Sequence, residues 1–532
     1  MDLRQVTMKK IKSTILSVAV AALCPAVLTG CGDYLEIIPE NNLAVDNFWA
    51  SKSDVASALN SGYYYLRASV EEKLIPWGEQ RAGVIYGRSM GANVLQNFQI
   101  KSTSGICSWA DMYKIINQAN LVLQNAGKAQ GNDPTYTTEE VNSHYCEAYF
   151  LRALAYFYIV RNWRDAPLVT VPYETDETPL QIEKSQESVL IQQIQSDLTA
   201  AMRLGAAKDL WDTTWETKGK ATKWSIYALM ADVCLWNSQF DEAIKYCDMI
   251  LEDKSGNAPA LITSPRTHTG WFAMFNPGNS KESIFEVQWN QEKADGSGTQ
   301  QNTLYDRFAG LETGSYYISQ QAMTEFREDY EYQKTAFRVF AEPENACRTL
   351  HGSYSGDDGR VWKYIGGSSL LEERTAAARD VNFIIYRVAD IMLMKAEALV
   401  MRGKGLVAAD NAEAISLINA IRERSNCEAV TADGTEPVTT LMDYIVRERV
   451  MELLAEGRIW YDLLRISRYT GIDGFDAKSY ATNKVVYYSA TNQNASESWI
   501  KNVLLNENAW FLPVYESEMK NNGKLVQNPY YQ

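Results

Sequence analysis

Three carboxylates, spaced four residues apart, are the first residues in this chain that could do chemistry. Glu448, Glu452 and Glu456 lie in the stretch RERVMELLAEGRIWYDLLR. A pair of carboxyl groups is what glycoside hydrolysis needs as acid and base. The spacing, however, places all three on one face of a helix, where ion pairs form readily. Three arginines of the same stretch are available as partners: Arg447, Arg449 and Arg458. We therefore interpret the carboxylates as part of a helix-packing ion-pair network.

No other pattern with catalytic spacing occurs. A P-loop, an HExxH motif and a Ser-His-Asp pattern are all missing from the sequence, and SGDDG at 355–359 is too short for a calcium loop. The chain has only 3 histidines, and no CxxC pair occurs among its 8 cysteines. The sequence therefore predicts no metal site, no cofactor and no enzymatic activity. In YRVAD, we expect Arg387 and Asp390 to make an interhelical contact.

Aromatic residues in loop-rich stretches are better candidates for binding a ligand. The faces of sugars pack on planar rings, while their hydroxyls bond to amides or guanidinium groups. The candidate rings are Trp77, Tyr86, Trp271, Tyr316, Tyr317 and Trp362. Arg88, Asn93 and Asn97 could supply hydrogen bonds beside the first two. For each ring taken singly, the alternative is that it packs an insertion onto the rest of the fold.

Amphipathic helices are the elements that must position these residues. From Trp109 onward, apolar residues recur mostly at spacings of three and four up to Ala126, which predicts a helix. A second helix is predicted to begin at Thr137, because Thr137 and Glu140 form a capping-box pattern.

A repeat of helix pairs is the strongest signal of organisation. Residues 227–251 alternate large and small side chains as a tetratricopeptide helix pair does, and a looser copy covers 392–418. A long helical stretch is expected at 441–465, and a strand at 283–289. The sequence thus predicts a mainly α fold, a tetratricopeptide-like helical-repeat scaffold with a few short strands. Its scaffold segments are about 31–73, 107–289 and 376–470.

Two irregular insertions interrupt this scaffold. Residues 74–106 form the first insertion and residues 290–375 the second; both are rich in Gly, Ser and Asn and carry many aromatics. Loops on a rigid scaffold are where binding residues concentrate. We therefore expect the two insertions to face the ligand.

The N-terminal segment has the features of a lipoprotein signal peptide. Lysines at 9, 10 and 12 precede an apolar run at 15–28, which is shorter than the ~20 residues of a membrane-spanning helix. Residues 28–31, Leu-Thr-Gly-Cys, resemble a bacterial lipobox. We therefore expect residues 1–30 to be removed and Cys31 to be lipidated. Several acyl chains on that one residue would anchor the protein durably to a membrane.

Net charge argues against some classes of partner, and the cysteine content is compatible with an exported protein. The chain carries a formal charge of −15, which argues against nucleic acid and against anionic lipid surfaces as partners. Several of the six cysteines after Cys31 lie in apolar helical runs, where a free thiol acts as a small hydrophobe. One or two disulfides are compatible with an exported protein, and the sequence does not define their pairing.

Several stretches together resemble the SusD/RagB family of nutrient-binding outer-membrane lipoproteins of Bacteroidota. They follow the family's order through nearly all of the mature chain: CGDYLEIIPENN, FWASKSDVASALNSGY, WADMYKIINQANLVL, EAYFLRALAYFYIVRNWRDAPLV, ESIFEVQW, NFIIYRVADIMLMKAEALV, RERVMELLAEGRIWYDLLR and NGKLVQNPYYQ. Arg164 departs from the pattern, since the family usually has glycine there; we interpret it as a local change of loop.

The resemblance implies a single SusD-like domain over 31–532 that is lipid-anchored at the cell surface of the outer membrane. It implies capture of oligosaccharides or polysaccharides and their delivery to a SusC-like TonB-dependent transporter. A peptide-capturing member of the same family is the alternative, followed by a tetratricopeptide interaction scaffold or a glycoside-processing enzyme. The family has no ligand-site motif, so no binding residue is carried over from it.

Overall fold

The computed structural model of the chain describes residues 48–87, 94–173, 181–264, 268–289, 302–309, 315–336, 348, 352–355, 359–367, 372–375, 378–490 and 495–532. The chain divides into a unit of residues 1–50 and a compact unit of residues 51–532, which contains every element discussed below. The predicted signal peptide and Cys31 lie outside the described residues.

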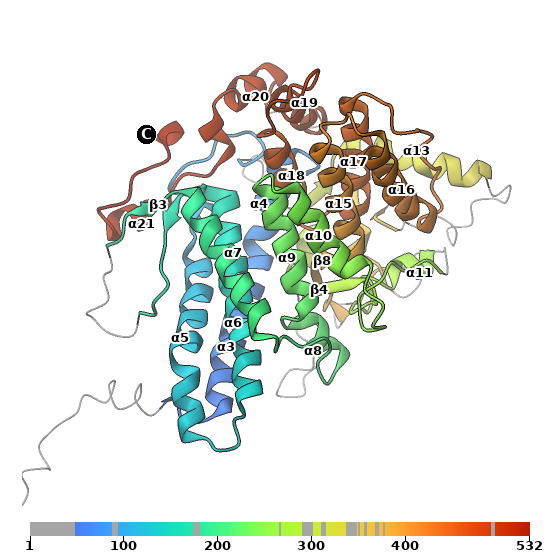
Figure 1. Cartoon of the computed structure of the whole chain (residues 1–532). Helices are drawn as coiled ribbons and strands as arrows, with labels where there is room; N and C mark the ends of the chain where they lie inside the picture. Colours follow the sequence, from blue (N-terminus) through green and yellow to red (C-terminus); the bar gives the residue numbers. More distant parts are fainter. Residues whose placement is uncertain are drawn as a thin grey trace, which may run out of the picture. The chain divides into compact units, whose positions relative to one another are not determined.

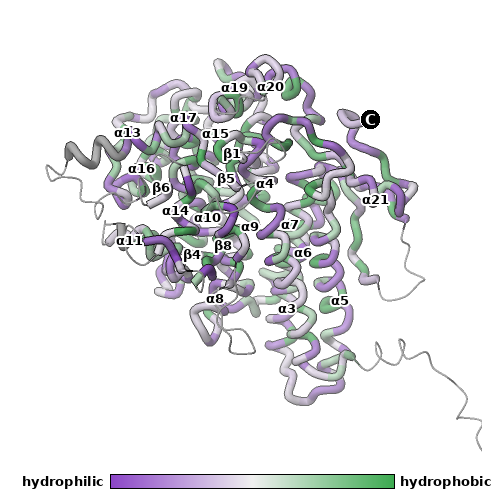
Figure 2. Tube along the Cα trace, turned by 180° about the vertical axis from the view of Figure 1, so that it is seen from behind, coloured by the Kyte–Doolittle hydropathy of each residue, from purple (hydrophilic) through white to green (hydrophobic). Residues whose placement is uncertain are grey.

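Four long helices pack side by side in the first half of the compact unit (Figure 1). They are α3 (Lys52–Ser69), α5 (Ala110–Asn132), α6 (Thr138–Trp163) and α7 (Glu187–Leu204). Both helices predicted in this region are confirmed. The capping box at the start of α6 is present, with Thr137 N–H donating to Glu140 Oε2 at 2.9 Å. Figure 2 shows hydrophilic and hydrophobic residues alternating along α3 and α5, as amphipathic packing requires.

The tetratricopeptide-like pairs are also confirmed. Residues 227–251 lie in α9 (Lys223–Trp236) and α10 (Phe240–Leu251), which pack against each other. The looser copy lies in α15 (Val388–Arg402) and α16 (Ala408–Arg424). Ala231 and Ala243 are completely buried in the first pair, because small residues let the two backbones approach closely.

The helical stretch expected at 441–465 is two helices, α17 (Val438–Leu453) and α18 (Ile459–Ile466). Ala455 and Gly457 have positive φ values between them, which turns the chain. Glu79, from the first insertion, accepts hydrogen bonds from the N–H groups of Gly457 and Arg458 at 2.9 and 3.1 Å. A contact from a segment remote in sequence therefore stabilises the break.

The described strands are short and form four antiparallel pairs: β1 (Ile85–Gly87) with β5 (Tyr316–Ile318), β2 (Ala166–Pro167) with β3 (Lys184–Ser185), β4 (Ser283–Val287) with β8 (Phe383–Arg387), and β6 (Tyr354–Ser355) with β7 (Arg360–Val361). The predicted strand at 283–289 is β4. Arg164 ends α6 at φ 65°, a conformation that glycine adopts more readily, so the chain keeps the turn although it lacks the glycine.

The remaining helices connect and cover these elements. They are α4 (Ile75–Gly78), α8 (Thr214–Gly219), α11 (His268–Phe272), α12 (Leu304–Phe308), α13 (Gln320–Ala336), α14 (Trp362–Ile365), α19 (Ala477–Ser489), α20 (Glu497–Leu504) and α21 (Glu516–Asn521), with a π-helical turn at Val70–Leu74 and short 3₁₀ turns at Gln80–Ala82, Gly105–Cys107, Glu507–Trp510 and Pro529–Tyr531. The five cysteines in the described part of the chain are all free and buried.

Candidate functional site

The two insertions meet in the folded chain. Strand β1 of the first insertion pairs with β5 of the second, with Tyr86 opposite Tyr317. Strand β5 also contacts β7, and Ile318 N–H donates to the carbonyl of Gly359, the residue before β7, at 2.8 Å. We call this place, formed by β1, β5 and β7, the insertion junction. Segments more than 200 residues apart in sequence are thus brought to one place.

Most of the candidate rings are buried. Trp77 has no exposed surface; its indole donates to the Ile106 carbonyl at 2.8 Å, and its ring lies edge-on to Trp163 with centroids 5.3 Å apart. Trp271 is buried under the guanidinium of Arg424, which lies 5.0 Å from the ring centroid. Neither ring offers a face to a sugar, so we correct the interpretation of both to packing residues.

Trp362, Tyr316 and Tyr317 are buried as well. Arg307 donates to the Tyr316 hydroxyl at 2.8 Å, which engages that hydroxyl within the fold. The burial of these three rings favours packing of the second insertion over direct stacking on a ligand.

Tyr86 is the predicted ring that keeps partial exposure. It lies on β1 at the insertion junction, and its ring centroid is 6.0 Å from that of Tyr317. Arg88 and Asn93, predicted to act beside it, lie outside the described residues, and Asn97 is buried. Within the described residues, the insertion junction with Tyr86 is therefore what remains of the predicted ligand site.

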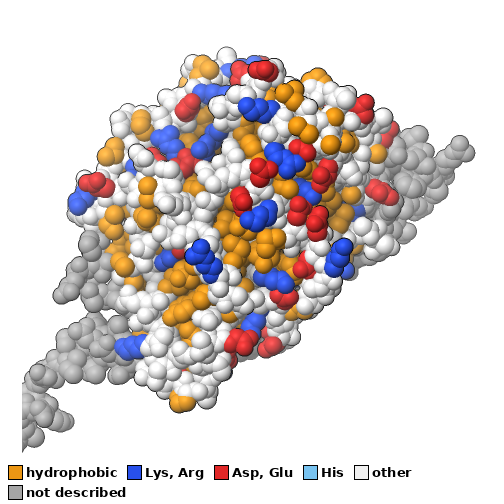
Figure 3. Space-filling view, in the orientation of Figure 1, with side chains coloured by type: hydrophobic (Ala, Val, Ile, Leu, Met, Phe, Trp, Pro, Cys, Tyr) orange, Lys and Arg blue, Asp and Glu red, His pale blue; other side chains and the backbone are white. Residues whose placement is uncertain are grey.

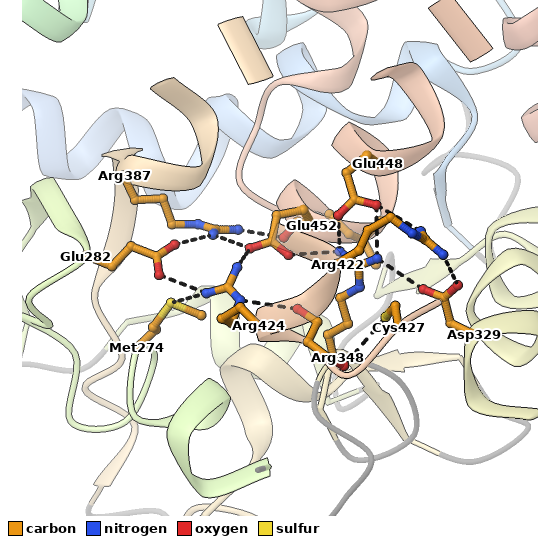
Figure 4. Close-up of polar contacts among 12 residues, drawn as sticks. Met274, Glu282, Asp329, Arg348, Arg387, Arg422, Arg424, Cys427, Glu448 and Glu452 are labelled. Atoms are coloured by element: carbon orange, nitrogen blue, oxygen red, sulfur yellow. Dashed lines mark hydrogen bonds and ion pairs between the residues drawn. The ribbon is translucent and has the colours of Figure 1, made fainter. Parts of the chain in front are cut away.

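A buried ion-pair network fixes the second insertion to the scaffold (Figure 4). Asp329 of α13 and Arg348 belong to the second insertion. Arg348 pairs with Glu448 and Glu452 of α17. The network comprises Glu282, Asp329, Arg348, Lys363, Arg387, Arg422, Arg424, Glu448, Glu452 and Glu456. Its formal charges balance, which is the condition for burying so many ions.

This network supports the structural interpretation of Glu448, Glu452 and Glu456. Their partners, however, are not the expected arginines of the same stretch. Arg447 pairs with Glu328, Arg449 with Asp390 and Asp462, and Arg458 with Asp390. The expected contact between Arg387 and Asp390 was also wrong, because Arg387 pairs with Glu282, Glu452 and Glu456. The arginines that bind the three glutamates come from other elements, where helical spacing gives no signal.

The electrostatics of the network argue against acid catalysis. Burial opposes ionisation of Glu452, but Arg424, Arg387 and Arg348 outweigh it and hold the pKa well below its usual value. Burial likewise opposes ionisation of Glu456, while Arg387 and Lys363 lower its pKa. A general acid in glycoside hydrolysis needs a raised pKa and access to substrate. Both carboxylates are instead ionised and buried.

Sequence reasoning missed exposed rings on two scaffold helices. Tyr64 of α3 and Trp215 of α8 are 58% and 39% exposed. Both rings lie outside the two insertions, where composition gives no signal of a binding site. The polar surroundings of Trp215 in DTTWETKGK could have indicated its exposure.

Among the described residues, no group of three or more His, Cys, Asp or Glu side chains could hold a metal ion. In the same part of the chain, no helix has both the length and the apolarity to cross a membrane. Figure 3 shows acidic and basic side chains interspersed with apolar ones over the visible face. That face carries no broad basic field of the kind that binds nucleic acid.

Two family models match the chain. A family described as "Starch-binding associating with outer membrane" matches residues 33–235, and the "SusD family" matches residues 361–531. The chain is 26% identical over 509 residues to SusD-like protein P38 of Formosa agariphila, covering 88% of this chain and 94% of that protein. It is 25% identical over 498 residues to a SusD-like protein of Bacteroides ovatus, covering 86% and 83%.

Solved structures share the fold. A SusD superfamily protein of Bacteroides thetaiotaomicron superposes with a TM-score of 0.68 at 20% identity, over 91% of this chain and 99% of that one. A structure described as a laminarin-binding SusD-like protein superposes with a TM-score of 0.63 at 21% identity, over 90% and 100%. The predicted fold class is therefore confirmed.

Proposed function

Because the chain belongs to the SusD/RagB family, we propose that it binds oligosaccharides or polysaccharides at the cell surface and delivers them, uncleaved, to a SusC-like TonB-dependent transporter. The observation that carries the proposal is the insertion junction. There two irregular segments of the chain pair through β1 and β5 and present Tyr86 beside Tyr317.

Two findings on relatives support a glycan as the ligand. One matching family is described by starch binding, and one structural relative is described as binding laminarin. A partly exposed tyrosine on a short strand suits this ligand class, because its ring can pack on a sugar face while its hydroxyl bonds outward. The buried network supports the site indirectly by anchoring the second insertion, so that the ring is held in place before the ligand binds.

The state of the carboxylates supports binding without cleavage. Glu448, Glu452 and Glu456 are each buried and paired with cations. Moving a proton to a glycosidic oxygen would require breaking pairs that stabilise the fold. The role of these residues is therefore to hold the second insertion on the scaffold.

Location and partner belong to the same proposal. A lipid on Cys31 anchors the chain to the outer membrane, and the first family description, which names association with the outer membrane, supports this. A transporter is the partner that such a surface binding protein requires, because the captured glycan must then cross the outer membrane.

Titration of the purified protein with a mixed panel of glycans and peptides tests this function. We expect at least one glycan to bind in isothermal titration calorimetry, and prolonged incubation with it to yield no shorter product by chromatography. Binding of peptides alone would replace the glycan by a peptide ligand. Reproducible cleavage of that glycan by the purified wild-type protein would contradict a purely binding role.

A further inference from the structure

A pocket on the helical scaffold is lined like a sugar-binding site, and the proposed function does not use it. It lies between α3 and α8 over β4, elements that lie next to one another in the lower part of Figure 2. Its volume is about 450 Å³, within the roughly 300–1,000 Å³ of small-molecule sites. We call it the α3–α8 pocket; Tyr64, Arg67, Trp215 and Phe285 are among its lining residues.

The floor of the α3–α8 pocket is rigid. Phe285 of β4 is buried, with ring centroids 5.0 Å from Phe150 and 6.4 Å from Tyr63. The Tyr63 hydroxyl accepts a hydrogen bond from Ala221 N–H and donates one to Glu147, both at 2.9 Å. These bonds tie α3 to the segment that follows α8, so the two walls of the pocket are held at a fixed separation.

The walls carry two exposed rings. Tyr64 and Trp215 leave about half and more than a third of their surface in solvent, although packing them away would gain free energy. Trp215 stands in the first turn of α8, which Thr213 caps by accepting a hydrogen bond from Glu216 N–H. A helix fixed at its start holds the indole ring in place, as a stacking surface for a sugar requires.

Polar groups without partners lie beside these rings. In the described structure, no hydrogen bond or ion pair engages the side chains of Arg67 or Asn60, the indole N–H of Trp215 or the hydroxyl of Tyr64. The Arg67 guanidinium lies 5.6 Å from the centroid of the Tyr64 ring. Donors and acceptors are thus available next to two apolar faces, which is the combination that a hydroxylated ring requires.

The charge of the α3–α8 pocket favours an anion. Lys220 and Glu216, its other charged lining residues, pair with each other at 2.9 Å. Arg67 therefore leaves the pocket with one uncompensated positive charge, on a chain whose formal charge is −15. Guanidinium groups bind carboxylates and sulfur or phosphorus oxyanions through two parallel hydrogen bonds.

We propose that the α3–α8 pocket is a second glycan site, which binds a sugar unit bearing a carboxylate or sulfate group. Tyr64 and Trp215 stack on the C–H face of the sugar, Arg67 bonds the anionic group, and Asn60 bonds a hydroxyl. This inference rests on the proposed glycan-binding function. It adds a contact formed by elements other than those of the insertion junction.

Calorimetric titration with three probes tests the proposal: trigalacturonic acid, a sulfated carrageenan hexasaccharide and neutral galactotriose. We expect at least one anionic probe to bind more tightly than galactotriose, and the two anionic arms distinguish carboxylate from sulfate. Trp215→Ala should weaken that binding about tenfold, as loss of one stacking contact does. Arg67→Ala should abolish the preference for the charged probe, and Arg67→Lys should restore part of it.

Matched controls come from outside the pocket. Tyr487 is 42% exposed on α19, and Arg203 is exposed near the end of α7. Tyr487→Ala and Arg203→Ala should leave the affinity for the anionic probe unchanged. Because Trp215 is exposed, its replacement should also leave the melting temperature unchanged. Trp215→Phe, which keeps an aromatic face, should retain most of the affinity.

Unchanged affinity in both Trp215→Ala and Arg67→Ala overturns the second site, as does a wild-type protein that binds neither anionic probe. If Tyr86→Ala weakens glycan binding while the pocket variants do not, the second site fails and the proposed function stands. If no glycan of any kind binds, both fail.

Discussion

Removing the charge of Glu452 should destabilise the protein strongly, because this carboxylate holds three buried guanidinium groups together. It pairs with Arg348 at 3.0 Å, with Arg387 at 2.5 Å, and with Arg424. The substitution Glu452→Gln keeps the shape of the side chain and one oxygen. It leaves the network with one positive charge that no carboxylate compensates.

The expected loss is large because all four side chains are almost completely buried. Removing one partner of a buried ion pair typically costs about 3–5 kcal/mol of unfolding free energy. With an m value of roughly 3 kcal/mol/M, the urea midpoint should fall by about 1–1.7 M. Urea unfolding followed by circular dichroism measures this shift.

A surface ion pair between α17 and α13 provides the control. Arg447 of α17 and Glu328 of α13 also form an ion pair, but both side chains are substantially exposed. Glu328→Gln should cost about 0–1 kcal/mol, as surface ion pairs usually do. Equal midpoints for Glu452→Gln and the wild type would refute the view that this network holds the second insertion on the scaffold.

Three further outcomes are expected. Burial raises the pKa of Glu79 to about 8, although the N–H groups of Arg458 and Gly457 donate hydrogen bonds to its carboxylate. The contribution of Glu79 to stability is therefore full below the ordinary pKa of a glutamate and is lost as the pH rises toward 8. The melting temperature of Glu79→Gln should exceed that of the wild type at pH 8 and match it near pH 4.5, and an equal difference at both pH values would contradict this. Trp77→Ala should lower the unfolding free energy by about 3–5 kcal/mol, because the ring is a core residue, while the folded fraction keeps its glycan affinity. A variant that is as stable as the wild type but has lost its affinity would show that Trp77 belongs to the ligand site. Cys31→Ser should leave the protein uncleaved or soluble in the periplasm, and cell fractionation that finds it processed and still in the outer membrane of a strain without its transporter would contradict the lipid anchor.

The helices of the scaffold could be predicted from the sequence because their signals are local. The capping box at Thr137 and the spacing of small residues in 227–251 depend on neighbours within a few turns. The break between α17 and α18 was missed for the opposite reason. The carboxylate that stabilises it belongs to Glu79, far away in the sequence.

The candidate site could be predicted only in part. The expectation that the two insertions act together agrees with the pairing of β1 and β5, but composition does not determine which rings face inward. Trp77 and Trp362 lie in irregular segments and are nevertheless buried, because irregular segments need apolar anchors to pack on a scaffold. The partners of Glu452 were likewise beyond sequence reasoning, since Arg348, Arg387 and Arg424 come from three different segments.

The affinity of Tyr86→Ala for the glycan that binds the wild type most tightly is the most direct test of the central claim. If the insertion junction is the ligand site, loss of this ring should weaken binding about tenfold, or about 1.4 kcal/mol. The melting temperature should fall less than it would for a fully buried ring, because Tyr86 keeps part of its surface exposed. Unchanged affinity, with the variant folded as the wild type is, would contradict the assignment of the glycan site to this junction.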